Sequence, residues 1–171
     1  MKKTMSLFAL VLAALAAQDR LNVKSANGIA FSEFRGYESW PSIAPSQPDD
    51  GLKTITGNSV MINAYKEGFP GNGKPVPDGA MMAKIDWTKK ASSESPYPVQ
   101  VPDALKRVGL MMKDSKRFPD TDGWGYAQFV YDAGSDSFKP ESSDPAFAKV
   151  CHSCHTLVKA KNFVFTAYPV R

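Results

Sequence analysis

The chain has 171 residues, of which 43% are hydrophobic and 22% are charged. This length and composition fit one globular domain with a buried core. The formal net charge is +4, but the basic residues are scattered along the chain. Nucleic-acid binding usually needs a concentrated basic stripe, so we expect no nucleic-acid partner.

The first residues have the pattern of a targeting signal. Two lysines precede an apolar stretch, residues 5–17, that is too short to span a bilayer. Residues 14–16 read Ala-Leu-Ala, which is a small-residue cleavage site. We therefore expect residues 1–16 to be a signal peptide that directs residues 17–171 to the periplasm, with no membrane span in the mature chain. A buried N-terminal helix is the alternative interpretation.

Short elements are expected because 13 prolines and 12 glycines are spread along the chain. One helix is predicted over residues 30–40, where aromatic residues recur at helical spacing before Pro41. Residues 41–53 and 67–79 are rich in prolines or glycines and are predicted to be loops. The strands that the side-chain pattern predicts are residues 59–65, 80–87, 107–113, 125–132 and 163–165.

The predicted strand at residues 80–87 has two different faces. Strict alternation places Met82, Lys84 and Asp86 on one side of it. The adjacent methionine pairs at residues 81–82 and 111–112 are candidate axial ligands of a haem iron. However, core packing is the role we expect for them, because methionine fills irregular gaps in cores.

The most informative residues lie near the C-terminus. Residues 151–155 read Cys-His-Ser-Cys-His and hold both cysteines and both histidines of the chain. A Cys-x-x-Cys-His string is the attachment site of a c-type haem. Cys151 and Cys154 would bond to the vinyl groups, and His155 would ligate the iron. A zinc site or a redox-active thiol pair is the alternative, although a four-ligand zinc site would also need carboxylates.

A short helix is expected to carry this motif, with Asp144 as its cap and Pro145 at its first position. No Met or His follows His155 in the sequence, so any sixth iron ligand would come from upstream. A four-helix bundle would need long amphipathic helices. The frequent prolines and glycines and the alternating stretches argue against that fold.

Three blocks of the sequence resemble the cytochrome P-460 family, which includes the beta-type cytochromes c-prime. They are residues 79–84, residues 113–126, and the motif at residues 151–155 with the aromatic tail that follows it. The resemblance implies an α+β fold, in which a strongly curved five-stranded antiparallel sheet and a few helices pack around one covalent haem c. It also implies a homodimer.

The resemblance also implies a function. In the P-460 branch a strand lysine is bonded to the haem macrocycle, and Lys84 occupies that position by motif. Those enzymes oxidise hydroxylamine at an iron with an open sixth position, and a soluble cytochrome accepts the electrons. In the beta-type c-prime branch the lysine bond is absent and the protein binds nitric oxide without turnover. A simple electron carrier with a methionine ligand is a further alternative.

Hydroxylamine oxidation removes protons as well as electrons, so a carboxylate near the iron would assist it. Glu141 and Asp144 lie just before the haem motif. They are the candidate catalytic carboxylates, with a solvated loop as the alternative role for both.

Overall fold

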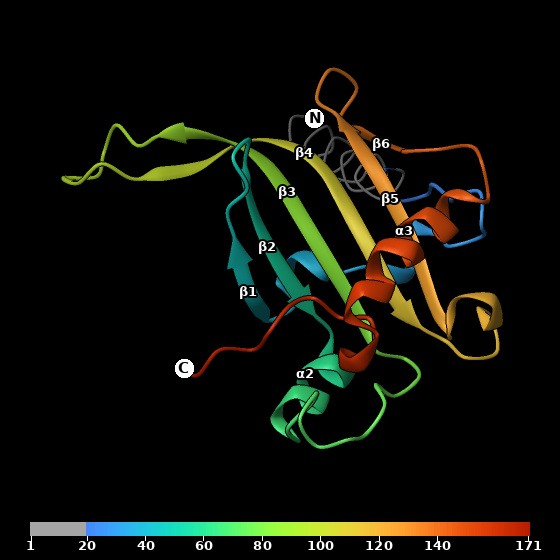
Figure 1. Cartoon of the computed structure of the whole chain (residues 1–171). Coiled ribbons are helices and arrows are strands. Elements are labelled where there is room, and N and C mark those ends of the chain that lie inside the picture. The colour runs from blue at the N-terminus through green and yellow to red at the C-terminus, as the bar shows by residue number, and fades with distance from the viewer. Residues whose placement is uncertain (1–19) are drawn as a thin grey trace, which may run out of the picture.

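The fold is one antiparallel sheet with helices on both faces, as the computed structural model of residues 20–171 shows (Figure 1). The expected signal peptide, residues 1–16, lies outside the described residues. The strands are β1 (Ser42–Ser46), β2 (Leu52–Gly57), β3 (Met81–Ala91), β4 (Gln100–Lys113), β5 (Trp124–Asp132) and β6 (Ser137–Pro140). They pair in sequence order, and every neighbouring pair is antiparallel.

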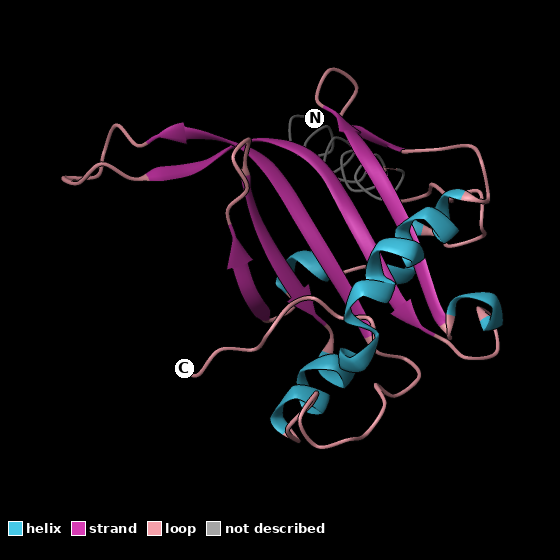
Figure 2. Cartoon of the chain, in the orientation of Figure 1, coloured by secondary structure: helices cyan, strands magenta, loops and turns pink. Residues whose placement is uncertain are grey.

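The helices are short and interrupt the run of strands (Figure 2). Within residues 20–171, two are α-helices and four are 3-10 helices, namely η1 (Phe31–Phe34), η2 (Tyr37–Ser39), α2 (Ser59–Lys66), η3 (Pro119–Thr121), α3 (Phe147–His155) and η4 (Thr156–Lys161). The α+β class and the antiparallel sheet are therefore confirmed. The sheet has six strands where five were expected, and it is open, with β1 and β6 at its edges.

Three predicted strands are confirmed: residues 80–87, 107–113 and 125–132 lie in β3, β4 and β5. The predicted helix at residues 30–40 is present as the two 3-10 helices η1 and η2. β3 and β4 are longer than predicted, and their outer parts project beyond the sheet as a two-stranded arm (Figure 1).

The predicted strand at residues 59–65 is wrong, because this segment is helix α2. The Asn58 side chain caps the helix by accepting a hydrogen bond from the Met61 backbone N–H at 3.0 Å. Most positions of this segment are apolar, so its pattern fits a helical period as well as a strand period. The buried side chains are at the helical spacing of Met61, Ile62, Ala64 and Tyr65.

Two further expectations are also wrong. The loop predicted over residues 41–53 contains β1 and the start of β2, and its Pro45 is tolerated because β1 is an edge strand. The strand predicted over residues 163–165 is a turn followed by irregular chain. Asn162 and Phe163 have positive φ angles of 51° and 64°, which end any regular pairing there.

Alternating side chains of the sheet build one hydrophobic core on each face. The core under α3 contains Met82, Met111 and Tyr126, together with residues of α2 and the C-terminal segment. The opposite core contains Ala83 and Val108, and the 3-10 helices η1 and η2 cover it. The sheet thus separates two layers, and one of them holds the haem motif (Figure 1).

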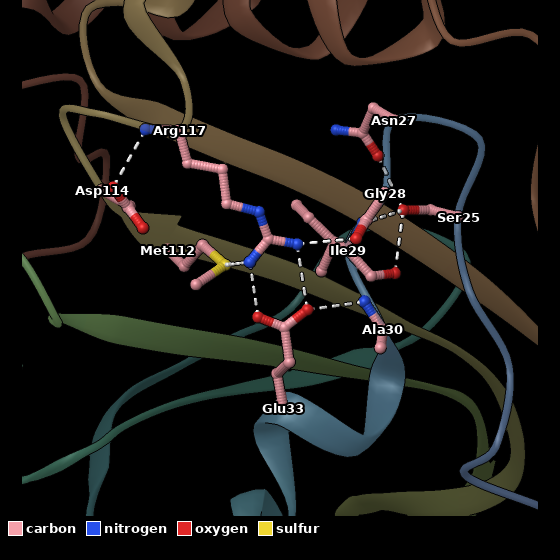
Figure 3. A network of polar contacts seen from close by, with 9 residues as sticks. All are labelled: Ser25, Asn27, Gly28, Ile29, Ala30, Glu33, Met112, Asp114 and Arg117. Atoms are coloured by element: carbon pink, nitrogen blue, oxygen red, sulfur yellow. Dashed lines mark hydrogen bonds and ion pairs between the residues drawn. The ribbon is translucent and has the colours of Figure 1, made fainter.

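Arg117 attaches the N-terminal segment to the turn between β4 and β5 (Figure 3). Its guanidinium donates two hydrogen bonds to the Glu33 carboxylate, at 2.6 and 3.0 Å, and one to the Gly28 carbonyl at 2.6 Å. The same carboxylate accepts from the Ala30 N–H at 2.8 Å. Hydrogen bonding by Arg117 holds the pKa of Glu33 below its usual value. This two-pronged ion pair fixes η1 against the sheet.

We predict that Glu33→Gln lowers the free energy of unfolding by about 1–2 kcal/mol at neutral pH, because charged hydrogen bonds are lost. Glu38→Gln is the matched control, since Glu38 is exposed and lies in the neighbouring helix η2. A carboxyl whose folded-state pKa is lowered stabilises the fold above its unfolded pKa and loses that effect as the pH falls through the folded value. Urea unfolding should therefore show the difference in free energy of unfolding between the wild type and Glu33→Gln at pH 7, and this difference should disappear in acid. Equal effects of Glu33→Gln and Glu38→Gln at pH 7 would contradict the role of Glu33.

Candidate functional site

A cavity of about 410 Å³ lies between the sheet and α3. This volume falls in the range of cofactor and ligand sites, roughly 300–1,000 Å³. The side chains that line it come from β1 to β5, α3 and the C-terminal segment, and they are mostly apolar. They include Ile55, Met82, Lys84, Met111, Tyr126, Gln128, Cys151, Cys154, His155, Val164 and Phe165. The predicted haem-binding residues therefore meet at one site.

One row of paired residues forms the floor of the cavity. The strand register aligns Ile55 of β2 with Lys84 of β3, Gly109 of β4 and Gln128 of β5. All four line the cavity. Gln128 was not predicted to be functional, and only the register between β4 and β5 reveals that its amide reaches the site of Lys84.

The side chain of Lys84 lies across Gly109. A Cβ atom at position 109 would stand 3.2 Å from Lys84 Cε and 3.5 Å from Gln128 Oε1. The glycine thus leaves room for a lysine that points into the cavity. Burial lowers the pKa of Lys84, and the nearby Lys53 lowers it further. A lowered pKa increases the neutral fraction of the amine, which is the nucleophilic form.

The haem motif lies on α3, as predicted, although the helix begins at Phe147 and not at Pro145. Asp144 does not cap the helix, because it accepts a hydrogen bond from the Ala146 N–H at 2.8 Å in the preceding turn. Cys151 and Cys154 form no disulfide with each other, and both line the cavity. Burial raises the pKa of the Cys151 thiol.

His155 is oriented by the C-terminal segment. Its Nδ1 is 2.6 Å from the Phe163 carbonyl oxygen, so Nδ1 donates and carries the ring proton. Nε2 then bears the free lone pair that a metal needs. Burial also lowers the pKa of His155, which favours the neutral form. The left-handed turn at Asn162 and Phe163 turns this carbonyl toward the ring.

His152, inside the motif, takes part in a separate polar chain. Its Nδ1 is 3.2 Å from the Tyr126 hydroxyl, and its Nε2 is 3.1 Å from the Asp122 carboxylate. Tyr126 lines the cavity, and burial raises the pKa of its hydroxyl. These contacts fix α3 against β5.

A row of charges adjoins the row of Lys84. Asp86, whose side chain is 4% exposed, pairs with Arg107 at 3.4 Å and with Lys53 at 3.9 Å. Arg107 also pairs with Glu141 at 3.4 Å. A buried carboxylate needs such partners, and this row keeps two cations and two carboxylates beside the half-buried side chain of Lys84.

Neither predicted carboxylate lines the cavity. Glu141 is bound to Arg107 in the adjoining row. Asp144 borders a small separate hollow between the N-terminal segment and β5. No Asp or Glu belongs to the cavity wall within residues 20–171.

The chain around the cavity fits a covalently held haem. Two thiols and an imidazole with a free Nε2 enter the cavity from one helix, and the remaining wall is largely apolar. Gly109 leaves open a volume that any side chain would fill. Among residues 20–171, no three His, Cys, Asp or Glu side chains gather as a metal-ion site would require. In the same part of the chain, no helix is long and apolar enough to cross a membrane.

We predict that Gly109→Leu lowers the covalent haem content of the purified protein severalfold. The added side chain would collide with Lys84 and Gln128, and overpacking costs about 1–3 kcal/mol. Gly71→Leu is the control, because Gly71 lies in an exposed loop. Pyridine haemochrome absorbance measures the content, and an unchanged value for Gly109→Leu would contradict a haem seated over this glycine.

Comparison with known proteins agrees with this site. The family model described as Cytochrome P460 matches residues 34–166, which include β1 to β6, Lys84 and the whole haem motif. The chain matches no curated protein. Since the match covers most of the chain, this protein belongs to the cytochrome P-460 family of haem proteins.

Proposed function

We propose that this protein is a c-type haem enzyme that oxidises hydroxylamine to a nitrogen oxide and passes the electrons to a soluble cytochrome. One observation carries the proposal: Lys84 lines the same cavity as Cys151, Cys154 and His155. Lys84 is half-buried in a wall that is largely apolar, and the partial burial of an amine costs free energy. A protein that only binds a neutral gas has no need of this amine.

The role proposed for Lys84 is a covalent bond from Nζ to the haem macrocycle. The lowered pKa of Lys84 makes its neutral amine available for this reaction. The new C–N bond would replace one N–H and one C–H bond, and hydrogen peroxide would accept the two electrons and two protons released and leave as water. Gly109 supports the reaction by leaving the lysine an unobstructed path.

A haem held here would supply an iron whose sixth position is open to hydroxylamine. Cys151 and Cys154 would hold the group covalently, and His155 would bind its iron through Nε2. The apolar side chains of Met82, Val164 and Phe165 would exclude water from the cavity. The Gln128 amide would offer a hydrogen bond to a small polar ligand.

Protons released in the oxidation need acceptors, and we keep Glu141 and Asp144 in this role. Glu141 is the better placed, because its partner Arg107 lies in the row next to Lys84. Asp144 would act from the neighbouring hollow. We also propose, from the sequence and the family, that residues 1–16 direct export to the periplasm and that the mature protein is a homodimer.

Nitric-oxide binding without turnover is the second candidate function. The observation that favours it is the absence of Asp and Glu from the cavity wall within residues 20–171. An apolar pocket suits a small neutral ligand. Hydroxylamine oxidation, as proposed above, involves a bond between Lys84 and the haem, whereas nitric-oxide binding does not need this bond.

We predict that Lys84→Met lowers hydroxylamine turnover at least about tenfold. The reduced protein should change from a strongly red-shifted Soret band to an ordinary high-spin haem c spectrum. Lys89→Met is the matched control, since Lys89 lies in the same strand, β3, but does not line the cavity, and its loss should leave the band position unchanged. Equal spectra for the wild type and Lys84→Met would exclude the bond and favour nitric-oxide binding.

We predict that Glu141→Gln lowers kcat for hydroxylamine by about tenfold or more, because general-base catalysis contributes on the order of 10²–10⁴. Asp144→Asn should have a smaller effect, since Asp144 lies in a separate hollow. Steady-state assays with an artificial electron acceptor measure both values. Full activity of Glu141→Gln would remove Glu141 from the mechanism.

A further inference from the structure

The net positive charge of the chain comes from its C-terminal part. All 17 acidic residues precede Pro145, and 17 of the 21 basic residues lie there too, so residues 1–144 are formally neutral. The net charge of +4 therefore belongs entirely to residues 145–171. This segment contains the haem motif, so charge and cofactor site coincide.

Three lysines of this segment lie in the helix that carries the haem motif or just after it. Lys149 lies in α3, and Lys159 and Lys161 lie in η4, which continues from it. All three side chains are exposed. Within residues 20–171 none of them forms an ion pair, whereas Lys53, Lys74, Lys90 and Lys106 do. Their charges are thus available to a partner.

In the sequence, two exposed large apolar residues lie between these lysines. Val150 of α3 is 60% exposed and Leu157 of η4 is 82% exposed. Four of the six exposed large hydrophobic side chains in the described part of the chain belong to residues 145–171. We define the α3–η4 surface as Lys149, Val150, Leu157, Lys159 and Lys161. An apolar centre with a charged rim is the usual composition of a protein interface.

The α3–η4 surface belongs to the same helical segment as the haem motif. Cys154, which lines the cavity, is itself exposed on the same helix. A partner that covers this surface would stand next to the edge of a haem attached there.

A second copy of this chain is a poor occupant of the α3–η4 surface. A two-fold symmetric interface would place the same patch on both sides. Three unpaired lysines would then face three unpaired lysines, and like charges across an interface are unfavourable. The complementary occupant is an acidic protein.

We propose that the α3–η4 surface docks an acidic one-electron acceptor protein. The acceptor takes one electron from the reduced iron, and no bond or proton changes hands. This inference rests on the electron-transfer part of the proposed function. The lysine rim raises the association rate by steering, and the apolar centre orients the complex.

The test uses the dithionite-reduced, haem-loaded protein, so it needs no hydroxylamine. Stopped-flow spectroscopy would follow its oxidation by plant plastocyanin, chosen as an acidic one-electron protein. We expect the second-order rate constant to fall steeply with added salt. The triple variant Lys149→Glu, Lys159→Glu, Lys161→Glu should slow the reaction about tenfold or more at low salt, as expected for lost steering.

The matched control is the triple variant Lys24→Glu, Lys66→Glu, Lys116→Glu, which makes the same charge change at exposed lysines elsewhere. It should retain a rate well above that of the α3–η4 variant. Equal slowing by the two variants would overturn the proposal, because only net charge would then matter. Leu157→Ser should also slow the reaction with plastocyanin, while oxidation by a small uncharged quinone stays unchanged.

Sedimentation of the same variants tests whether a second copy of this chain occupies the α3–η4 surface. If Leu157→Ser or the α3–η4 triple variant dissociates a dimer, the surface joins two copies and the proposal is overturned. Hydroxylamine turnover is measured separately with the quinone. If the wild type does not turn over hydroxylamine, but its oxidation by plastocyanin still depends on the three lysines, the proposed function is overturned and the docking surface is supported.

Discussion

The register of strands β2 to β5 is the constraint on which the site depends. It aligns Ile55, Lys84, Gly109 and Gln128 in one row beneath α3. A shift of one residue in any pair would turn that strand's side chain to the opposite core. The glycine in this row then decides whether the lysine can extend, because a Cβ there would stand 3.2 Å from Lys84 Cε. Together, the strand register and Gly109 place the Lys84 side chain in the same cavity as the haem motif.

The environment of Lys84 joins folding to chemistry. Desolvation lowers the pKa of Lys84, and the adjoining row holds compensating charges on Asp86, Arg107 and Glu141. Removal of one member of such a row would leave a buried charge without a partner, which is strongly destabilising. The row therefore keeps a reactive amine in a stable sheet. Outside the cavity, the lysines of the α3–η4 surface face solvent. In our proposals, Lys84 bonds to the haem, whereas these surface lysines bind a partner protein.

The sequence predicted the parts of the molecule whose signals are local. The spacing in residues 151–155 and the alternation in residues 80–87 are local, and the structure brings Lys84 to the cysteines and His155. Helix α2 was predicted as a strand because most positions in it are apolar, so its pattern fits both periods. Gln128 and the pairing of Glu141 with Arg107 were not predicted, since they depend on contacts across strands. The turn at Asn162 and Phe163, which orients His155, has no glycine to reveal its positive φ angles.

The central claim is that Lys84 and the haem motif hold one and the same group. Mass spectrometry of the protease-digested native protein tests it most directly. The account predicts one species in which a haem joins the peptide that contains Lys84 to the peptide that contains Cys151 and Cys154. A haem found on the cysteine peptide alone, with the Lys84 peptide unmodified, would contradict the claim and leave a nitric-oxide-binding haem protein as the better description.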